Sequence, residues 1–420
     1  MSRCPFELII TSDNSNDNCS AAVWDPSTGS LMHQYKHAGL LGYHSLQLLK
    51  DSYLLASSAT KQNLIIWPLN SQMPMQNFRL GTPGLVTALA CAPSGSFIAA
   101  AIKRSDTNKI YIWQTCNGQL LRTISRHYQS ITCLIFNIDG SCLASGAEDG
   151  LIFVWDFSQV INEEEAKPLS TFSHTLPVKD LHFGKIGPSG RLYSVSLDKS
   201  CRIYNVHTQE TLLNLIFDVP LTVISTDIME NNIFVGSSNG KVFKCSLRTP
   251  PRGIDYHLTM NDKNEIISYK GHTDKITALS VSIDCKTLLT GSADEMVYLW
   301  DIESCQILLT IKHKAPIISA FFATAYKNFT VQNLEPSLKI KAFQTVPQQG
   351  GLNKIKKCRK TYDNSWLLDF EKEGKSNAIS MNEDELADCK AKLDNALAEV
   401  EQLKKINAEL YRYHAKNIIK

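Results

Sequence analysis

The sequence predicts an all-β fold, a seven-bladed β-propeller, followed by a C-terminal α-helical coiled coil. A motif that ends in tryptophan recurs about every 40–45 residues, and short strand-like runs fill each period. A seven-residue apolar repeat occurs near the end of the chain. We therefore expect a propeller over residues 1–323, a linker or extended arm over 324–380 and a coiled-coil helix over 381–420.

Tryptophan–aspartate pairs, or degenerate forms of them, mark the third strand of each expected blade. Successive marks are 43, 46, 42, 49, 41 and 55 residues apart, which is typical of WD40 repeats with insertions. Seven marks predict seven four-stranded blades. The pairs are Trp24-Asp25, Trp67-Pro68, Trp113-Gln114, Trp155-Asp156, Tyr204-Asn205, Cys245-Ser246 and Trp300-Asp301.

The last period shows all four strands of a blade, in the runs ITALSVS, KTLLTGS, MVYLWDI and ILLTIK. The first period supplies only three, ELII, AAVWD and LMHQYK, because no run precedes ELII. We expect PIISAFFA, residues 316–323, to be the missing innermost strand, since a propeller hides its strand edges only when the ring closes.

Three expected blades share a His, a hydroxyl, an Asp and an aromatic residue. The separations are 18, 4 and 6 residues in two of them, and the first is 20 in the third. A buried indole N–H needs an acceptor, which the hydroxyl provides; the hydroxyl can donate to the imidazole, whose other nitrogen binds the turn Asp. The resulting structural relay comprises His127, Ser145, Asp149 and Trp155; His174, Ser194, Asp198 and Tyr204; and His272, Thr290, Asp294 and Trp300.

These residue types also form the triad of a serine hydrolase. An enzyme needs one such site, whereas a repeat protein needs the same brace in every blade, so we interpret the relay as structural. The sequence contains neither a G-x-x-x-x-G-K-[ST] phosphate loop nor an H-E-x-x-H zinc helix. We expect no enzyme, with no catalytic residue, cofactor or metal site.

Two blades depart from the pattern. The second has Lys61 at the turn where Asp is expected, and the sixth has Asn239 there and no aromatic partner. We expect both to be weaker links, either tolerated losses or surfaces adapted to a partner. The extra residues 248–266, rich in Pro and polar types, predict a surface loop that is either a partner site or a decorative insertion.

The arm carries a run of basic residues. A run of this kind is typical of nuclear-localisation or phosphate-contacting segments and also of solvated linkers. An apolar cluster at 366–370 follows and is expected to dock on the propeller or on a partner. The basic patch consists of Lys354, Lys356, Lys357, Arg359 and Lys360.

From about Asn382 a helical pattern begins. One seam contains Leu386, Leu393 and Val400, with Asn407 at the next position, over about four heptads. Asn at a core position favours a fixed register and two strands. The alternative is an amphipathic helix packed back on the propeller. We favour pairing between chains, because an isolated helix of this length is marginal in water.

Composition limits the remaining classes. The 420 residues carry a net charge of +2, so no overall field attracts nucleic acid or membrane. The chain has no apolar run near the roughly 20 residues of a membrane span. The twelve cysteines are scattered without a C-x-x-C pair, which predicts a reduced intracellular protein without disulfides or zinc.

Particular strings resemble the WD-repeat protein eighteen family, the WD-repeat subunit of the Rix-type complex. They are SRHYQSITCLIF (125–136), HTLPVKDLHFG (174–184), LLNLIFDVPLTVISTD (212–227) and EQLKKINAELY (401–411). The resemblance covers about residues 20–320 and returns in the terminal helix.

The resemblance implies a nuclear scaffold, in nucleolus and nucleoplasm without excluding the cytoplasm. It implies helical-repeat subunits as partners, a place on the pre-60S particle with the Midasin ATPase, and a role in internal-transcribed-spacer rRNA processing. It leaves direct RNA contact open and implies no membrane. It also implies that two copies pair along a dimer seam of Leu386, Leu393, Val400, Leu403, Asn407 and Leu410.

Two other classes compete. A WD-repeat substrate receptor of a ubiquitin ligase usually carries an adaptor-binding helical segment before the propeller, and here the propeller pattern starts near residue 6. A chromatin or histone-binding adaptor needs an Arg ring, or an acidic and aromatic pocket, which the sequence does not show clearly.

Overall fold

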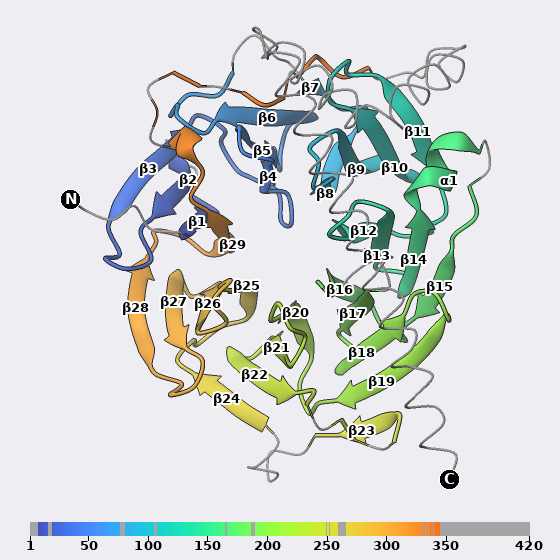
Figure 1. Cartoon of the computed structure of the whole chain (residues 1–420), viewed down its shortest axis with the longest axis vertical. Helices are drawn as coiled ribbons and strands as arrows, with labels where there is room; N and C mark the ends of the chain where they lie inside the picture. The colour runs from blue at the N-terminus through green and yellow to red at the C-terminus, as the bar shows by residue number, and fades with distance from the viewer. Residues whose placement is uncertain are drawn as a thin grey trace, which may run out of the picture. The chain divides into compact units, whose positions relative to one another are not determined.

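The computed structural model describes residues 7–344, apart from 16–18, 76–79, 105–106, 164–165, 186–189, 249, 252, 259–265, 330, 332, 335 and 339. Within this range the chain forms seven sheets that follow one another around a ring (Figure 1). The predicted seven-bladed propeller is confirmed.

Each sheet is one blade, numbered here in chain order. Blade 1 contains β1 Glu7–Asp13, β2 Cys19–Trp24 and β3 Leu31–Lys36, and blade 2 contains β4 Gln47–Leu49, β5 Tyr53–Ser57, β6 Asn63–Pro68 and β7 Leu80–Gly81. Blade 3 contains β8 Leu85–Cys91, β9 Phe97–Arg104, β10 Thr107–Gln114 and β11 Leu120–Ile124. Blade 4 contains β12 Ile131–Phe136, β13 Cys142–Ala147, β14 Leu151–Asp156 and β15 Ser170–Ser173. Blade 5 contains β16 Val178–Phe183, β17 Arg191–Ser196, β18 Ser200–Asn205 and β19 Glu210–Ile216. Blade 6 contains β20 Leu221–Thr226, β21 Asn232–Ser237, β22 Lys241–Ser246 and β24 Ile266–Lys270. Blade 7 contains β25 Ile276–Val281, β26 Thr287–Ser292, β27 Met296–Asp301 and β28 Ile307–Lys312.

The ring closes through β29, Ile317–Thr324. This strand pairs antiparallel with β1 from Glu7 opposite Thr324 to Asp13 opposite Ile317, and it becomes the innermost strand of blade 1. Residues 316–323 therefore lie where the first blade lacked a strand in the sequence. The two ends of the propeller are joined by backbone hydrogen bonds rather than by side-chain contacts alone.

The core lies between the blades. Central strands such as β13 and β26 are almost completely buried, because a blade packs against a neighbour on each face. Hydrophobic clusters occupy all seven interfaces between neighbouring blades, including the interface of blade 7 with blade 1. The apolar runs of the sequence are thus explained by burial on both sides of each sheet.

Two small elements decorate the ring. The helix α1, Phe157–Asn162, follows β14 and is capped by the Asp156 carboxylate, which accepts from the backbone N–H groups of Ser158 and Gln159. The strand β23, Asp255–His257, comes from the expected surface loop 248–266 and pairs parallel with β19. Blade 5 therefore has a fifth strand that covers its outer edge.

The chain does not leave the propeller after β29. The described residues of 325–344, here called the strap, include a 3-10 turn at Lys327–Phe329 and continue across blades 2 and 3. Ile340 and Phe343 are buried in the interface between those blades. The sequence predicts a linker here because the apolar residues of the strap are widely spaced, and each of them packs into the propeller on its own.

Candidate functional site

The relay residues lie together in blades 4, 5 and 7. In blade 7 the Trp300 indole N–H donates to Thr290 Oγ1 at 2.9 Å, and His272 Nε2 lies 2.8 Å from the same hydroxyl. His272 Nδ1 lies 2.9 Å from Asp294 Oδ2. Because the carboxylate only accepts, we assign the imidazole proton to Nδ1, and Nε2 then accepts from the hydroxyl.

Blades 4 and 5 repeat this chain of contacts. Their imidazole Nε2 atoms lie 2.9 and 2.6 Å from the strand hydroxyls, and their Nδ1 atoms lie 3.1 and 2.9 Å from the turn carboxylates. The aromatic contact is longer in both, at 3.4 Å from Trp155 to Ser145 and 3.5 Å between Ser194 and the Tyr204 hydroxyl. Three blades thus carry the same hydrogen-bonded unit, and its contribution to stability stays a prediction.

Burial and pairing set the charge states of the relay. Burial lowers the pKa of His174 and His272 against the opposing effect of their Asp partners. Burial raises the pKa of Asp149 and Asp198, but hydrogen bonds from the imidazole and from the turn outweigh it, and both pKa values are lowered. The blade 5 relay therefore pairs a neutral His174 imidazole with an ionised Asp198 carboxylate near neutral pH.

Blade 1 holds a related set that the sequence analysis missed. The Trp24 indole N–H donates to Thr11 Oγ1 at 2.8 Å, and His313 Nδ1 lies 3.3 Å from Asp13 Oδ2. The signal was present, because His313 precedes Ile317 by four residues, as His272 precedes Ile276. It was hidden because the imidazole and its Asp partner lie at opposite ends of the propeller sequence.

Blades 2 and 3 have alanine where the hydroxyl stands in the relay blades. The Trp67 indole N–H donates instead to the Lys36 backbone carbonyl of blade 1 at 3.0 Å. The Trp113 indole N–H donates to the Gln344 carbonyl of the strap at 2.8 Å. Ala56 and Ala100 occupy the strand positions that match Ser145. These indoles are satisfied by other parts of the chain.

Blade 6 replaces the relay with apolar residues. Phe217 stands at the position of the His, Val235 at that of the hydroxyl and Cys245 at that of the Trp. All three are buried in one cluster, where the Phe217 and Phe243 rings lie 5.3 Å apart. The expectation of no polar relay in blade 6 agrees with this arrangement, and the exchange removes the indole and imidazole donors of the relay blades.

The strap holds blade 3 through backbone contacts as well. Lys341 N–H donates to the Thr115 carbonyl at 3.2 Å, and Gln344 N–H donates to the Gly118 carbonyl at 2.8 Å. Phe343 stacks on Trp113 with ring centres 5.2 Å apart. Gly118 has φ +69°, and a Cβ there would lie 1.9 Å from the Ala342 carbonyl oxygen. Only glycine allows both this turn and this approach.

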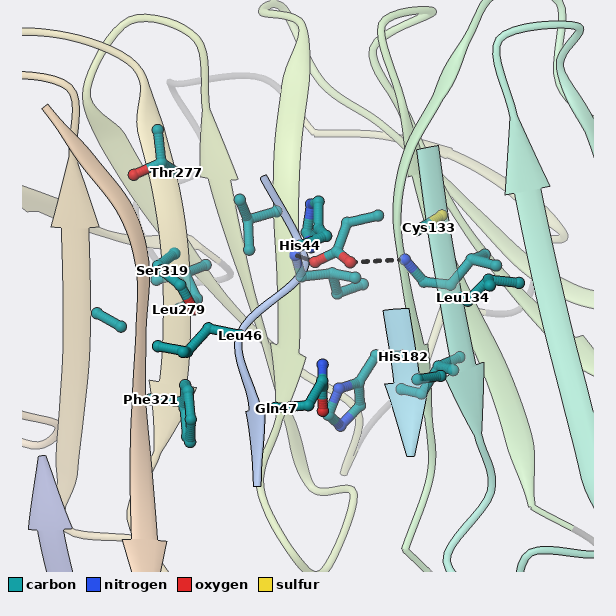
Figure 2. A pocket seen from close by; sticks show the side chains of 18 of the residues that line it. His44, Leu46, Gln47, Cys133, Leu134, His182, Thr277, Leu279, Ser319 and Phe321 are labelled. Atoms are coloured by element: carbon teal, nitrogen blue, oxygen red, sulfur yellow. Dashed lines mark hydrogen bonds between the residues drawn. The ribbon is translucent and has the colours of Figure 1, made fainter. Parts of the chain in front are cut away.

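A cavity of about 400 Å³ lies in the central channel, lined by residues from all seven innermost strands. Figure 2 shows Thr277 and Cys133 toward one end of it and Gln47, His182 and Phe321 toward the other. The walls are mainly apolar, and among the lining residues Asp180 is the single carboxylate, with no lysine or arginine.

Residues 42–45, here called the plug, cross one end of the channel. Tyr43 lies in the connection between blades 1 and 2, and its hydroxyl donates to the Thr277 carbonyl of blade 7 at 3.0 Å. His44 adopts φ 51°, and its carbonyl accepts from Leu89 N–H at 3.3 Å. Since Thr277 is the second residue of β25, the plug lies where the innermost strands begin.

Asp180 lies next to the plug, buried with 8% of its surface exposed. Its two carboxylate oxygens accept from the backbone N–H groups of Leu181 and Ile224, at 2.9 and 3.0 Å. Burial nevertheless raises the pKa of this carboxyl to about 7. Burial also lowers the pKa of His44 to about 4 and of His182 to about 3, so both imidazoles are uncharged at neutral pH.

The sequence analysis did not single out this group. The matching positions of blades 4, 6 and 7 are Cys133, Val223 and Ala278. A carboxylate at a position that is otherwise small or apolar was the available signal.

The basic patch and the dimer seam lie outside the described residues. Among the residues that are described, no group of three or more His, Cys, Asp and Glu side chains is arranged to hold a metal ion. No helix in that same range is long and apolar enough to cross a membrane. The cysteines of the described range, nine in number, are free thiols.

Comparison with known proteins agrees with the WD-repeat fold. The family model described as WD domain, G-beta repeat, matches residues 118–156 and 263–301, which end at the third strands of blades 4 and 7. WD repeat-containing protein 18 of Mus musculus is 35% identical over 343 residues, 81% of this chain and 78% of that protein.

Two further relatives extend the match. WD repeat-containing protein 18 of Danio rerio is 29% identical over 433 aligned positions, 99% of each chain. Pre-rRNA-processing protein pro-1 of Caenorhabditis elegans is 26% identical over 337 residues, 78% of this chain and 63% of that protein.

Proposed function

This chain belongs to the family of WD repeat-containing protein 18, and from that membership we propose that it is a non-catalytic scaffold subunit of a nuclear complex that matures the large ribosomal subunit. The observation that carries the proposal is the match to the Danio rerio protein over 99% of both chains. The match to a protein named for pre-rRNA processing supports ribosome assembly as the process.

The geometry of the relays supports a scaffold rather than an enzyme. The same His, hydroxyl and Asp contacts recur in blades 4, 5 and 7, with each hydroxyl buried beneath its imidazole. A nucleophile must reach its substrate, whereas a buried, fully bonded unit stiffens a sheet. We therefore assign these residues to the stability of the ring that presents binding surfaces.

We propose further that the nuclear complex is of the Rix type. Helical-repeat subunits of a Rix-type complex would bind the chain, and through them the pre-60S particle and Midasin would be reached. The C-terminal helix would pair two copies, in nucleolus and nucleoplasm, during internal-transcribed-spacer processing.

Affinity purification of tagged full-length protein at moderate salt, followed by mass spectrometry, tests this proposal. We expect helical-repeat proteins, large-subunit precursor factors and Midasin. A chain that ends at Gln349 lacks residues 350–420, which include the predicted coiled-coil helix, and serves as the comparison for partners of that helix. Recovery of cullin-ligase components or of histones alone would favour the two competing classes and contradict ribosome assembly.

Light scattering tests the pairing of two copies. Replacing Leu393, Val400 and Leu403 together by Gln places amides in the apolar seam and should convert a dimer to a monomer. The matched control replaces Asp394 and Glu401, at outward heptad positions, by Gln. An unchanged mass for the seam variant would remove the dimer from the proposal.

Nuclear import is tested with the basic patch. Changing its five basic residues to Gln should reduce nuclear accumulation of the fluorescently tagged full chain, because import receptors bind clustered positive charge. Unchanged accumulation, with partners depleted so that they cannot carry the chain along, would show that the patch is not the signal.

A further inference from the structure

The central channel contains a carboxylate without a counter-ion. No ion pair to Asp180 occurs among the described residues, whose ion pairs are all between His and Asp. Its carboxyl oxygens meet only the two backbone N–H groups of Leu181 and Ile224, and each oxygen can accept further bonds. The nearby imidazoles of His44 and His182 are neutral and cannot balance its charge.

The cavity beside this carboxylate has apolar side chains together with the polar groups of His44, Gln47 and His182. Leu134, Leu181, Ile224, Leu279 and Phe321 form much of the wall. A charge held against such a wall is costly unless an opposite charge approaches it. The pKa of Asp180 is raised because burial makes its charged form costly.

The two ends of the cavity differ in what lies beside them. The plug, with Tyr43 bonded to Thr277, crosses the end where the innermost strands begin. Phe136 and Cys91, the last residues of β12 and β8, line the cavity toward the other end. Asp180 is the third residue of β16, so roughly 10 Å of strand separates it from Phe183 at that other end.

We propose that the channel cavity binds one lysine or arginine side chain, which a partner protein inserts from the end opposite the plug, with Asp180 as its counter-ion. A long side chain with an apolar stem and a charged tip fits this geometry, because the stem lies along the apolar wall while the tip reaches the carboxylate.

Calorimetric titration of the full chain with short peptides tests the proposal. The probes are acetyl-Gly-Gly-Lys-Gly-Gly-amide and its Arg and norleucine counterparts, together with n-butylammonium chloride. We expect the Lys or Arg peptide to bind with a Kd on the order of 1 mM, as a single anchoring side chain would. The norleucine peptide, which keeps the stem and lacks the charge, should bind at least roughly tenfold more weakly.

Two variants assign the binding to the carboxylate. Asp180→Asn should weaken the basic peptide at least roughly tenfold. The matched control is Asp227→Asn, since Asp227 is also a buried Asp that accepts backbone N–H groups but lies outside the cavity. If Asp180→Asn does not fold, Ser319→Lys keeps the carboxylate and places an ammonium in the cavity, which should abolish binding.

Each remaining outcome contradicts the proposal. Equal binding of the Lys, Arg and norleucine peptides would show an apolar site, and binding that survives in both channel variants would place it elsewhere. Binding of n-butylammonium without binding of either basic peptide would mean that the cavity takes a free amine rather than a partner's side chain.

Discussion

Blades 3 and 4 are neighbours in the ring and bury similar tryptophans, but they satisfy the indole N–H in different ways. In blade 4 the acceptor is Ser145 of the same sheet. In blade 3 it is the carbonyl of Gln344, which is 231 residues away in the sequence. In both blades the buried indole N–H needs an acceptor, because a buried N–H without a partner is costly.

The comparison shows how a degenerate repeat stays stable. Blade 4 is self-contained, since its imidazole, hydroxyl and carboxylate belong to one sheet and the loop before it. Blade 3 depends on the strap, and blade 2 depends on Lys36 of blade 1. Loss of the motif therefore shifts stability from local to long-range contacts, and the following experiments separate the two.

Removal of the strap should have the largest effect. A chain that ends at Thr324 loses the buried side chains of Ile340 and Phe343, at about 1.5–3 kcal/mol each, and leaves the Trp113 indole N–H without its acceptor, at about 1–3 kcal/mol. Hydrogen exchange should show faster opening of blade 3 than of blade 4. The control ends at Gln349 and keeps the strap; equal exchange in both truncations would contradict the dependence of blade 3 on the strap.

A single glycine should reproduce part of that effect. Gly118→Ala strains a positive-φ turn, at about 1–2 kcal/mol, and pushes the strap away, at a further 1.5–3 kcal/mol or so. Gly39→Ala is the matched control, because Gly39 has φ +70° and open space around a Cβ. Equal denaturation midpoints for the two variants would mean that the close approach of Ala342 is unimportant.

Breaking one relay should have an intermediate effect confined to its blade. Asp294→Ala leaves His272 Nδ1 without its partner and should lower the free energy of unfolding by about 1–3 kcal/mol. Asn239→Ala changes the matching turn of blade 6, which has no imidazole to lose, and should cost less. Equal losses, measured by urea denaturation, would show that the turn rather than the relay matters.

Acidification should give the smallest difference, and its sign follows from the pKa shifts. The folded pKa of His174 is lowered below the ordinary value of 6.5. The unfolded chain therefore binds more protons, and the free energy of unfolding falls as pH drops through about 6.5. Asp198, whose pKa is also lowered, adds a further loss below about pH 4.

The variant His174→Phe isolates this contribution, because it places in blade 5 the residue type that Phe217 supplies in blade 6. The denaturation midpoint of the variant should fall less between pH 7.5 and 5.5 than that of the natural chain. The channel groups also titrate, but they are present in both chains, so their contributions cancel when the two curves are subtracted. As the pH falls, His44 and His182 lower the free energy of unfolding in the same way as His174, whereas Asp180 raises it. Parallel curves would contradict a titrating relay.

Much of this architecture was predictable where the signal is local. The offsets among His272, Thr290, Asp294 and Trp300 lie within 28 residues, so one blade and one loop determine them. The set in blade 1 escaped notice because His313 reaches Asp13 across the closure of the ring. The same distance in sequence concealed the acceptors of Trp67 and Trp113.

The sequence by itself determined the number of blades, the order of their strands and the three complete relays, because a repeating pattern of apolar, turn and hydrogen-bonding residues has few other solutions. The tertiary structure alone decided that the strap lies on blades 2 and 3, that the plug joins blade 2 to blade 7, and that Asp180 faces an apolar channel. These features depend on contacts between segments that are far apart in the sequence, and the residue spacing within a single repeat cannot predict such contacts.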